Sequence, residues 1–130
     1  MKKRILVVED DGDMQKIYRK VLSTSYDVTL VSNVDEAWKS LWKNTPDLII
    51  LDILLPKNKM GDEFYLQIRQ HSSCSSIPVI VVSVLDEKSS GEMLKKVNNV
   101  FWITKPFEEK QLLDKIGEML SGVGRKKTKK

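Results

Sequence analysis

Short apolar runs rich in β-branched residues recur along the chain and alternate with amphipathic segments. Five such runs, bounded by turn residues and acids, cover residues 4–8, 26–31, 47–51, 77–82 and 100–103. The second run alternates, with apolar residues at Val28 and Leu30, whereas the others are nearly continuous in apolar character. This pattern predicts strands that are covered on both faces, as in a parallel sheet.

Helical periodicity fills the segments between these runs. Apolar residues recur at intervals of three and four in two N-terminal segments, one at Met14, Ile17, Tyr18, Val21 and Leu22 and the other at Val34, Ala37, Trp38, Leu41 and Trp42. Asn33, with Glu36 three residues later, predicts a capping box at the start of the second helix, and Pro46 lies beyond its predicted end. We expect Trp38 and Trp42 to pack on the apolar stripe of that helix. Three further stripes occur at Phe64 and Ile68, at Met93, Leu94 and Val97, and at Leu112, Leu113, Ile116, Met119 and Leu120.

Five consecutive strand–helix units define the fold class. They predict a single α/β domain with a doubly wound five-stranded parallel sheet, helices on both faces and the strand order 2-1-3-4-5. We place the domain at residues 1–121, and residues 122–130 form a basic flexible tail or linker remnant.

Composition and charge narrow the picture further. The chain has 130 residues, 41% apolar and 31% charged, a globular balance. The formal net charge is +4, but five basic residues lie in the C-terminal tail, and the rest of the chain holds 17 basic and 18 acidic residues. Basic charge therefore gives no argument for direct nucleic-acid binding by the folded body. The single cysteine, Cys74, excludes an internal disulfide and suits a reducing cytoplasm. No apolar run is long enough to span a membrane.

Polar residues follow the predicted strands at their carboxyl ends, where open α/β sheets bind ligands. Glu9 and Asp10 follow the first strand, Asp52 the third, Ser83 the fourth, and Lys105 lies just beyond the fifth. The first and third strands are neighbours in the predicted order. We therefore expect Glu9, Asp10 and Asp52 to share one pocket, with Ser83 and Lys105 beside it.

Three carboxylates in one pocket require compensating charge. Two unit charges about 4 Å apart repel by about 4 kcal/mol at an effective dielectric constant of about 20, and one lysine cannot offset three acids. Oxygen ligands favour Mg²⁺, or Mn²⁺, over zinc. Asp52 is then a candidate nucleophile that accepts a phosphoryl group as an acyl phosphate. The metal and Lys105 would offset charge on the transferred group, and Ser83 would hydrogen-bond one of its oxygens.

Four segments carry a family resemblance, in this order: ILVVEDD at residues 5–11, LDILLP at 51–56, IPVIVVS at 77–83 and TKPF at 104–107. With these segments the chain resembles, over about residues 4–120, the receiver domain of bacterial two-component response regulators, the CheY-like, flavodoxin-like fold. The resemblance implies that Asp52 is the phosphoacceptor, which is phosphorylated by a histidine kinase or a phosphotransfer protein.

The resemblance also implies roles for the surrounding residues. Glu9 and Asp10 would hold Mg²⁺ together with Asp52 and the backbone carbonyl of Leu54. Ser83 would be the switch hydroxyl, and Trp102 would take the position of the switch aromatic residue. Lys105 would contact the phosphoryl group and precede a cis peptide bond at Pro106.

These assignments predict a signalling switch rather than an enzyme. Phosphorylation would alter the surface of the fourth helix, fifth strand and fifth helix, which would contact an output partner or a missing output domain. The protein would be a monomer or a weak homodimer through that surface. Leu54 and Leu85, two residues after Asp52 and Ser83, are apolar and cannot orient water, so any self-dephosphorylation would be slow.

Two other functions stay open at this point. A Mg²⁺-dependent phosphohydrolase could use the same aspartyl nucleophile, although one well-known class needs a second aspartate where this chain has Leu54. A receiver-like interaction module that is never phosphorylated is the other alternative. The basic tail would at most assist nucleic-acid binding.

Overall fold

The computed structural model describes residues 2–53, 67–71, 74–83 and 100–121. Its five strands form one sheet: β1 (Arg4–Val8), β2 (Asp27–Val31), β3 (Leu48–Ile53), β4 (Val79–Ser83) and β5 (Val100–Thr104). All strand pairs are parallel, and the order is β2-β1-β3-β4-β5. The predicted fold class and strand order are thus confirmed.

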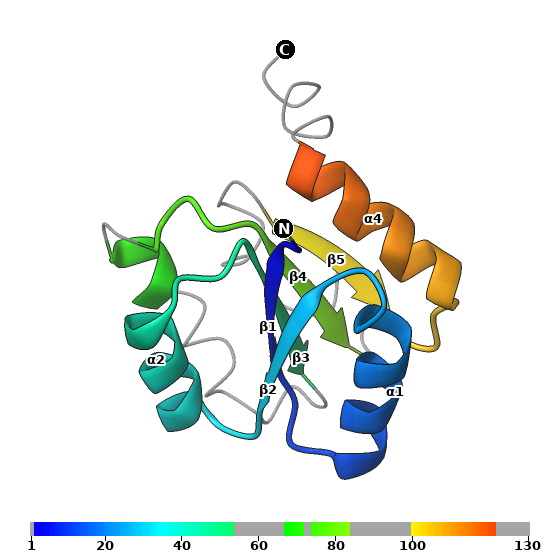
Figure 1. Ribbon diagram of the computed structural model, residues 1–130, viewed down its shortest axis with the longest axis horizontal. Helices are drawn as coiled ribbons and strands as arrows, with labels where there is room; N and C mark the ends of the chain where they lie inside the picture. Colours follow the sequence, from blue (N-terminus) through cyan, green and yellow to red (C-terminus); the bar gives the residue numbers. More distant parts are fainter. Residues whose placement is uncertain (1, 54–66, 72–73, 84–99, 122–130) are drawn as a thin grey trace.

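Helices cover both faces of the sheet (Figure 1). Helices α1 (Gly12–Leu22) and α4 (Glu109–Ser121) lie on one face, and α2 (Val34–Lys43) lies with helical residues 67–70 on the other. Helix α4 is the last of the predicted helices. The stripe at Met93, Leu94 and Val97, the tail at 122–130, and Leu54 and Leu85 lie outside the described residues.

Alternate residues of each central strand enter two separate cores. In β3, Leu48 and Ile50 pack on the α1–α4 face, whereas Ile49 and Leu51 pack on the α2 face. All four are at most 2% exposed. This division explains the continuous apolar runs, because both faces of the strand must be apolar. It also means that Asp52, next in the alternation after Leu48 and Ile50, faces α1.

Strand boundaries differ from the predicted ones by a residue or two, for identifiable reasons. Asp47 precedes β3, and its carboxylate accepts a hydrogen bond from the Arg4 backbone amide at 2.8 Å. Pro78 has no N–H and precedes β4, although its carbonyl still accepts from Ile49 at 3.0 Å.

Side-chain caps define the starts of two helices. Asp11 caps α1 by accepting from the Met14 amide at 3.0 Å, and Asn33 caps α2 by accepting from the Glu36 amide at 2.8 Å. The return bond of the predicted capping box goes from the Ser32 amide to Glu36 rather than from Asn33. The predicted start of α2 is confirmed.

Trp42 packs through ring contacts and is not enclosed by the core. It was predicted to pack on the apolar stripe of α2, and 57% of it stays exposed. Its position lies at the edge of the stripe, where its ring stacks on Trp38, with centroids 5.5 Å apart. Trp38 itself packs partly against the core, as predicted.

Candidate functional site

The carboxyl ends of β1, β3 and β5 bring three charged side chains together. Val8 of β1 pairs with Leu51 of β3, so the residues that follow, Glu9 and Asp52, lie at the same level of adjacent strands. Lys105 comes directly after β5. Its Nζ atom lies 2.6 Å from Asp52 Oδ1 and 3.9 Å from Glu9 Oε1.

These three groups are nearly removed from solvent. Glu9 is 1% exposed and Asp52 7%, and the Lys105 side chain is 12% exposed. A buried charge needs a close partner of opposite sign. The Lys105–Asp52 ion pair provides one, and the Lys105–Pro106 peptide bond is cis, as the resemblance implied.

Glu9 occupies an unusual environment for a carboxyl group. Burial, and after it the adjacent Asp52 carboxylate, raises the pKa of Glu9 from its ordinary value of 4.5 to about 9. The Asp11 amide, which donates to Glu9 Oε2 at 2.9 Å, and the Lys105 ammonium oppose this rise only in part. The metal-free site at neutral pH therefore contains a protonated Glu9 beside the Lys105–Asp52 pair.

Tyr18 is a member of the site that sequence reasoning missed. Its hydroxyl donates to Asp52 Oδ2 at 2.7 Å, and the residue is fully buried on α1. Burial and the Asp52 charge raise the Tyr18 pKa far above its ordinary value, so the hydroxyl stays a donor. The available signal was that Tyr18 is the only position of the first apolar stripe with a hydroxyl.

Gln15 is a second residue that the sequence did not reveal. Its Nε2 atom donates to the Glu9 backbone oxygen at 2.5 Å and to Ser32 Oγ at 3.2 Å. Gln15 therefore holds the segment after β1 against the end of β2, which fixes the backbone that carries Glu9.

Three other predicted site residues lie in the described part of the chain. Asp10 is exposed. Within the described ranges no group of three His, Cys, Asp or Glu side chains is gathered closely enough to hold a metal ion. Ser83 ends β4, and its backbone pairs with Ile53 and Thr104. Trp102 is half-buried and packs partly against the α2-side core.

The donor chemistry of the cluster fits a hard divalent cation. Glu9 Oε1 is buried and has no hydrogen-bond partner among the described residues, and the buried Asp52 Oδ1 lies 2.6 Å from the Lys105 ammonium. A buried carboxyl oxygen without a donor, next to a second carboxylate, suits a cation that prefers oxygen ligands.

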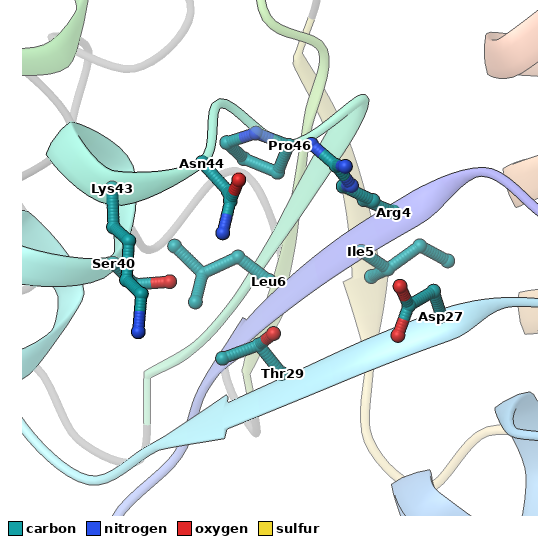
Figure 2. Close-up of a pocket in the computed structure, with 9 residues that line it drawn as sticks. All are labelled: Arg4, Ile5, Leu6, Asp27, Thr29, Ser40, Lys43, Asn44 and Pro46. Carbon is teal, nitrogen blue, oxygen red and sulfur yellow. The ribbon is translucent and has the colours of Figure 1, made fainter.

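A hollow of about 200 Å³ lies elsewhere, beside the amino-terminal halves of β1 and β2 and the end of α2 (Figure 2). Its lining mixes charged side chains of both signs, small polar groups and apolar side chains: Arg4, Ile5, Leu6, Asp27, Thr29, Ser40, Lys43, Asn44 and Pro46. It shares no residue with the carboxyl-end cluster, so it is not part of the candidate site.

Fold and site together define a class: a doubly wound α/β domain with a buried aspartate–lysine pair at the carboxyl edge of its sheet. The chain belongs to the response regulator receiver domain family, whose family model matches residues 5–117. This confirms the resemblance drawn from the four sequence segments, and it assigns the chain to two-component signalling. None of the described helices has the length and apolarity that crossing a membrane requires.

Full-length relatives extend well beyond this chain. The sensory transduction protein BceR of Halalkalibacterium halodurans is 34% identical over 121 residues, which are 92% of this chain and 51% of BceR. The alkaline phosphatase synthesis transcriptional regulatory protein PhoP of Bacillus subtilis is 31% identical over 121 residues, 92% of this chain and 49% of PhoP. The chain thus spans about half the length of these curated relatives.

Solved structures agree with the fold. The receiver domain of a signal transduction histidine kinase from Syntrophus aciditrophicus has a TM-score of 0.80 at 30% identity, covering 95% of this chain and 93% of that chain. The chemotaxis response regulator CheY4 of Vibrio cholerae also has a TM-score of 0.80, covering 92% of this chain and 99% of its own. At 23% identity, CheY4 supports the fold alone.

Proposed function

We propose that the protein is a phosphoacceptor switch in which Asp52 takes a phosphoryl group from a histidine kinase or a phosphotransfer protein. One observation carries this proposal: the Asp52 carboxylate is buried at the carboxyl end of β3, and the Lys105 ammonium lies 2.6 Å from one of its oxygens. A structural ion pair would explain the lysine alone. It would not explain why the same pocket also holds a buried Glu9 whose Oε1 has no hydrogen-bond partner within the described part of the chain.

The chemistry follows from the placement of the charges. A lone pair on an Asp52 oxygen forms the bond to phosphorus, and the bond from phosphorus to the donor nitrogen breaks with its electrons passing to that nitrogen. The transferred group carries negative charge on its outer oxygens. Lys105 is long and flexible enough to follow those oxygens while it remains beside Asp52. The terminal position of Ser83 on the adjacent β4 supports its role as a hydrogen-bond donor to the same group.

Mg²⁺, or Mn²⁺ in its place, is part of this proposal. Glu9, Asp10, Asp52 and the backbone carbonyl of Leu54 would hold it, and it would supply the positive charge that phosphoryl transfer to a carboxylate requires. Glu9 would lose its proton when the cation binds, because a metal ligand must be deprotonated.

The output surface is also proposed. Ser83 ends β4 and pairs with Thr104 of β5, so a movement at Ser83 acts directly on β5. We place the altered surface on the predicted helix between β4 and β5, on β5, where Trp102 is half-buried, and on α4. The partner of this surface would be a separate output protein or an output domain. The relatives are about twice as long as this chain, which is consistent with an additional domain in them. Self-association would use the same surface.

The direct test is phosphorylation of the full chain with phosphoramidate and Mg²⁺, followed by intact-protein mass spectrometry. The wild-type protein is expected to gain one phosphoryl group that alkaline hydroxylamine removes, since hydroxylamine cleaves acyl phosphates. Asp52→Asn is expected to gain none. Asp114→Asn is the matched control, because Asp114 is an exposed aspartate on α4. Modification of Asp52→Asn at the wild-type rate would refute the assignment.

The same preparation separates the alternatives. A phosphohydrolase would turn over a generic phosphomonoester for many cycles, whereas a switch stops after one phosphoryl group per chain. An interaction module that is never phosphorylated would gain no phosphoryl group from either a small donor or a phosphorylated kinase domain.

A further inference from the structure

Two different side chains hold the two oxygens of the Asp52 carboxylate. Lys105 Nζ lies 2.6 Å from Oδ1, and the Tyr18 hydroxyl donates to Oδ2 at 2.7 Å. The two oxygens are therefore not equivalent in this protein. One faces the Lys105 ammonium, and the other faces the Tyr18 hydroxyl donor on α1.

Packing on all sides holds the Tyr18 side chain in this position. It is fully buried and belongs to the core cluster formed by α1, α4 and the sheet. Its ring stacks against Phe107, with centroids 6.4 Å apart and planes inclined by 26°. Phe107 lies two residues after Lys105. The segment after β5 therefore carries Lys105, which contacts one Asp52 oxygen, and also Phe107, which packs on the tyrosine that contacts the other oxygen.

We propose that Tyr18 is a positioning residue for phosphoryl transfer. Its hydrogen bond to one Asp52 oxygen leaves the Lys105-facing oxygen as the atom that is phosphorylated. The same hydrogen bond makes the later departure of the phosphoryl group faster. This inference rests on the proposed phosphoacceptor function and extends it to a residue outside the predicted site.

The assignment of the oxygen follows from hydrogen-bond chemistry. In an acyl phosphate one carboxyl oxygen bonds to phosphorus and becomes a poor acceptor, while the other remains a carbonyl oxygen and a good one. If the Tyr18-facing oxygen bonded to phosphorus, a fully buried hydroxyl would lose its partner, which is unfavourable away from water. Attack by the Lys105-facing oxygen keeps the Tyr18 bond and places Lys105 beside the incoming group.

The effect on departure follows from charge. When water attacks, its oxygen bonds to phosphorus and one of its protons passes to bulk solvent. The bond from phosphorus to the Asp52 oxygen breaks, its electron pair returns to Asp52, and inorganic phosphate leaves with the water oxygen. The Tyr18 acceptor changes from a neutral carbonyl to a carboxylate, and hydrogen bonds to charged acceptors are stronger. Tyr18 therefore stabilises the transition state for departure more than the phosphorylated state.

The experiment measures decay of the phosphorylated full chain. Wild type, Tyr18→Phe and Tyr26→Phe are phosphorylated with phosphoramidate and Mg²⁺, the donor is removed, and the remaining phosphoryl group is followed by mass spectrometry. Tyr26 is the matched control, since it packs against the same core but precedes β2 at the opposite end of the strands. Decay of Tyr18→Phe is expected to be about fivefold slower, about 1 kcal/mol at about 1.36 kcal/mol per factor of ten, and Tyr26→Phe is expected to match wild type.

The direction of the change distinguishes a hydroxyl effect from a packing effect. A loosened core would admit water and make decay faster, so equal or faster decay in Tyr18→Phe overturns the inference. A wild-type chain that gains no phosphoryl group shows instead that the proposed function itself is wrong.

A second measurement does not depend on the variant. A crystal structure with beryllium trifluoride, a stable mimic of the phosphoryl group, is expected to show beryllium on the Lys105-facing oxygen and the Tyr18 hydroxyl on the other. Beryllium on the Tyr18-facing oxygen would refute the assignment.

Discussion

The raised pKa of Glu9 makes the stability of the metal-free protein depend on pH. Glu9 has a pKa of about 9 in the folded state against an ordinary value of 4.5 in an unfolded chain. Between these values the folded protein holds a proton at Glu9 that the unfolded chain has released. The contribution of Glu9 to stability is fully present below about pH 4.5 and is lost as the pH rises toward about 9.

The size of this effect follows from linkage. One protonation difference changes the free energy of unfolding by about 1.36 kcal/mol per pH unit. From pH 5.5 to 7.5 the contribution from Glu9 therefore falls by about 2.7 kcal/mol. That is a large part of the total stability of a small domain, which is about 5–15 kcal/mol.

The assay is urea unfolding at several pH values with a chelator present, for wild type, Glu9→Gln and Glu109→Gln. Glutamine keeps the size and neutrality of protonated Glu9 but cannot ionise. We expect Glu9→Gln to become more stable than wild type as the pH rises, with their difference growing by about 2.7 kcal/mol between pH 5.5 and 7.5. Glu109 is exposed on α4, and its variant should follow wild type. Parallel pH profiles for wild type and Glu9→Gln would refute the reasoning.

Three further predictions concern the same charges and one helix cap. Mg²⁺ affinity, measured by calorimetry, should rise by up to about tenfold per pH unit near neutrality, because Glu9 must release its proton, and Glu9→Gln should remove this slope. Lys105→Met should lower the unfolding free energy at pH 7 by about 3–5 kcal/mol, because it leaves Asp52 buried without its cation. The control, Lys110→Met, breaks an exposed ion pair and should change the unfolding free energy by less than about 1 kcal/mol. Equal effects of the two substitutions would contradict this prediction. Asn33→Ala should lower stability in urea by about 1 kcal/mol through loss of the α2 cap, and an unchanged midpoint would show that the cap contributes nothing.

Several features of the fold were predictable because they depend on local pattern. Continuous apolar runs are required wherever a strand is buried on both faces, as residues 48–51 are on the α1 and α2 sides. The start of α2 was predictable because Asn33 caps its own helix through a bond only three residues long. The exposure of the residue at the edge of the α2 stripe was not predictable, because periodicity does not show how much of a helix face the packed elements cover. Trp42 is exposed for that reason.

The candidate site was predictable only in part. That polar residues at strand ends would meet follows from parallel topology, and Glu9, Asp52 and Lys105 do meet. The partner of Asp52 on α1 did not follow, because a tyrosine on an apolar stripe has the same pattern as any other core residue. Only the facing of Asp52 toward α1 shows that the Tyr18 hydroxyl meets a carboxylate.

The sequence by itself determined the order of the elements, the parallel sheet and the identity of the charged residues at its carboxyl edge, because each of these depends on residue type and spacing along the chain. Tertiary structure alone decided which of those groups share a buried environment and which stay in water. Glu9 and Asp10 are adjacent in the chain, yet Glu9 is buried beside Asp52 and Asp10 is exposed. The physical reason is that a carboxyl pKa is set by desolvation and by neighbouring charges, and both depend on distances in space.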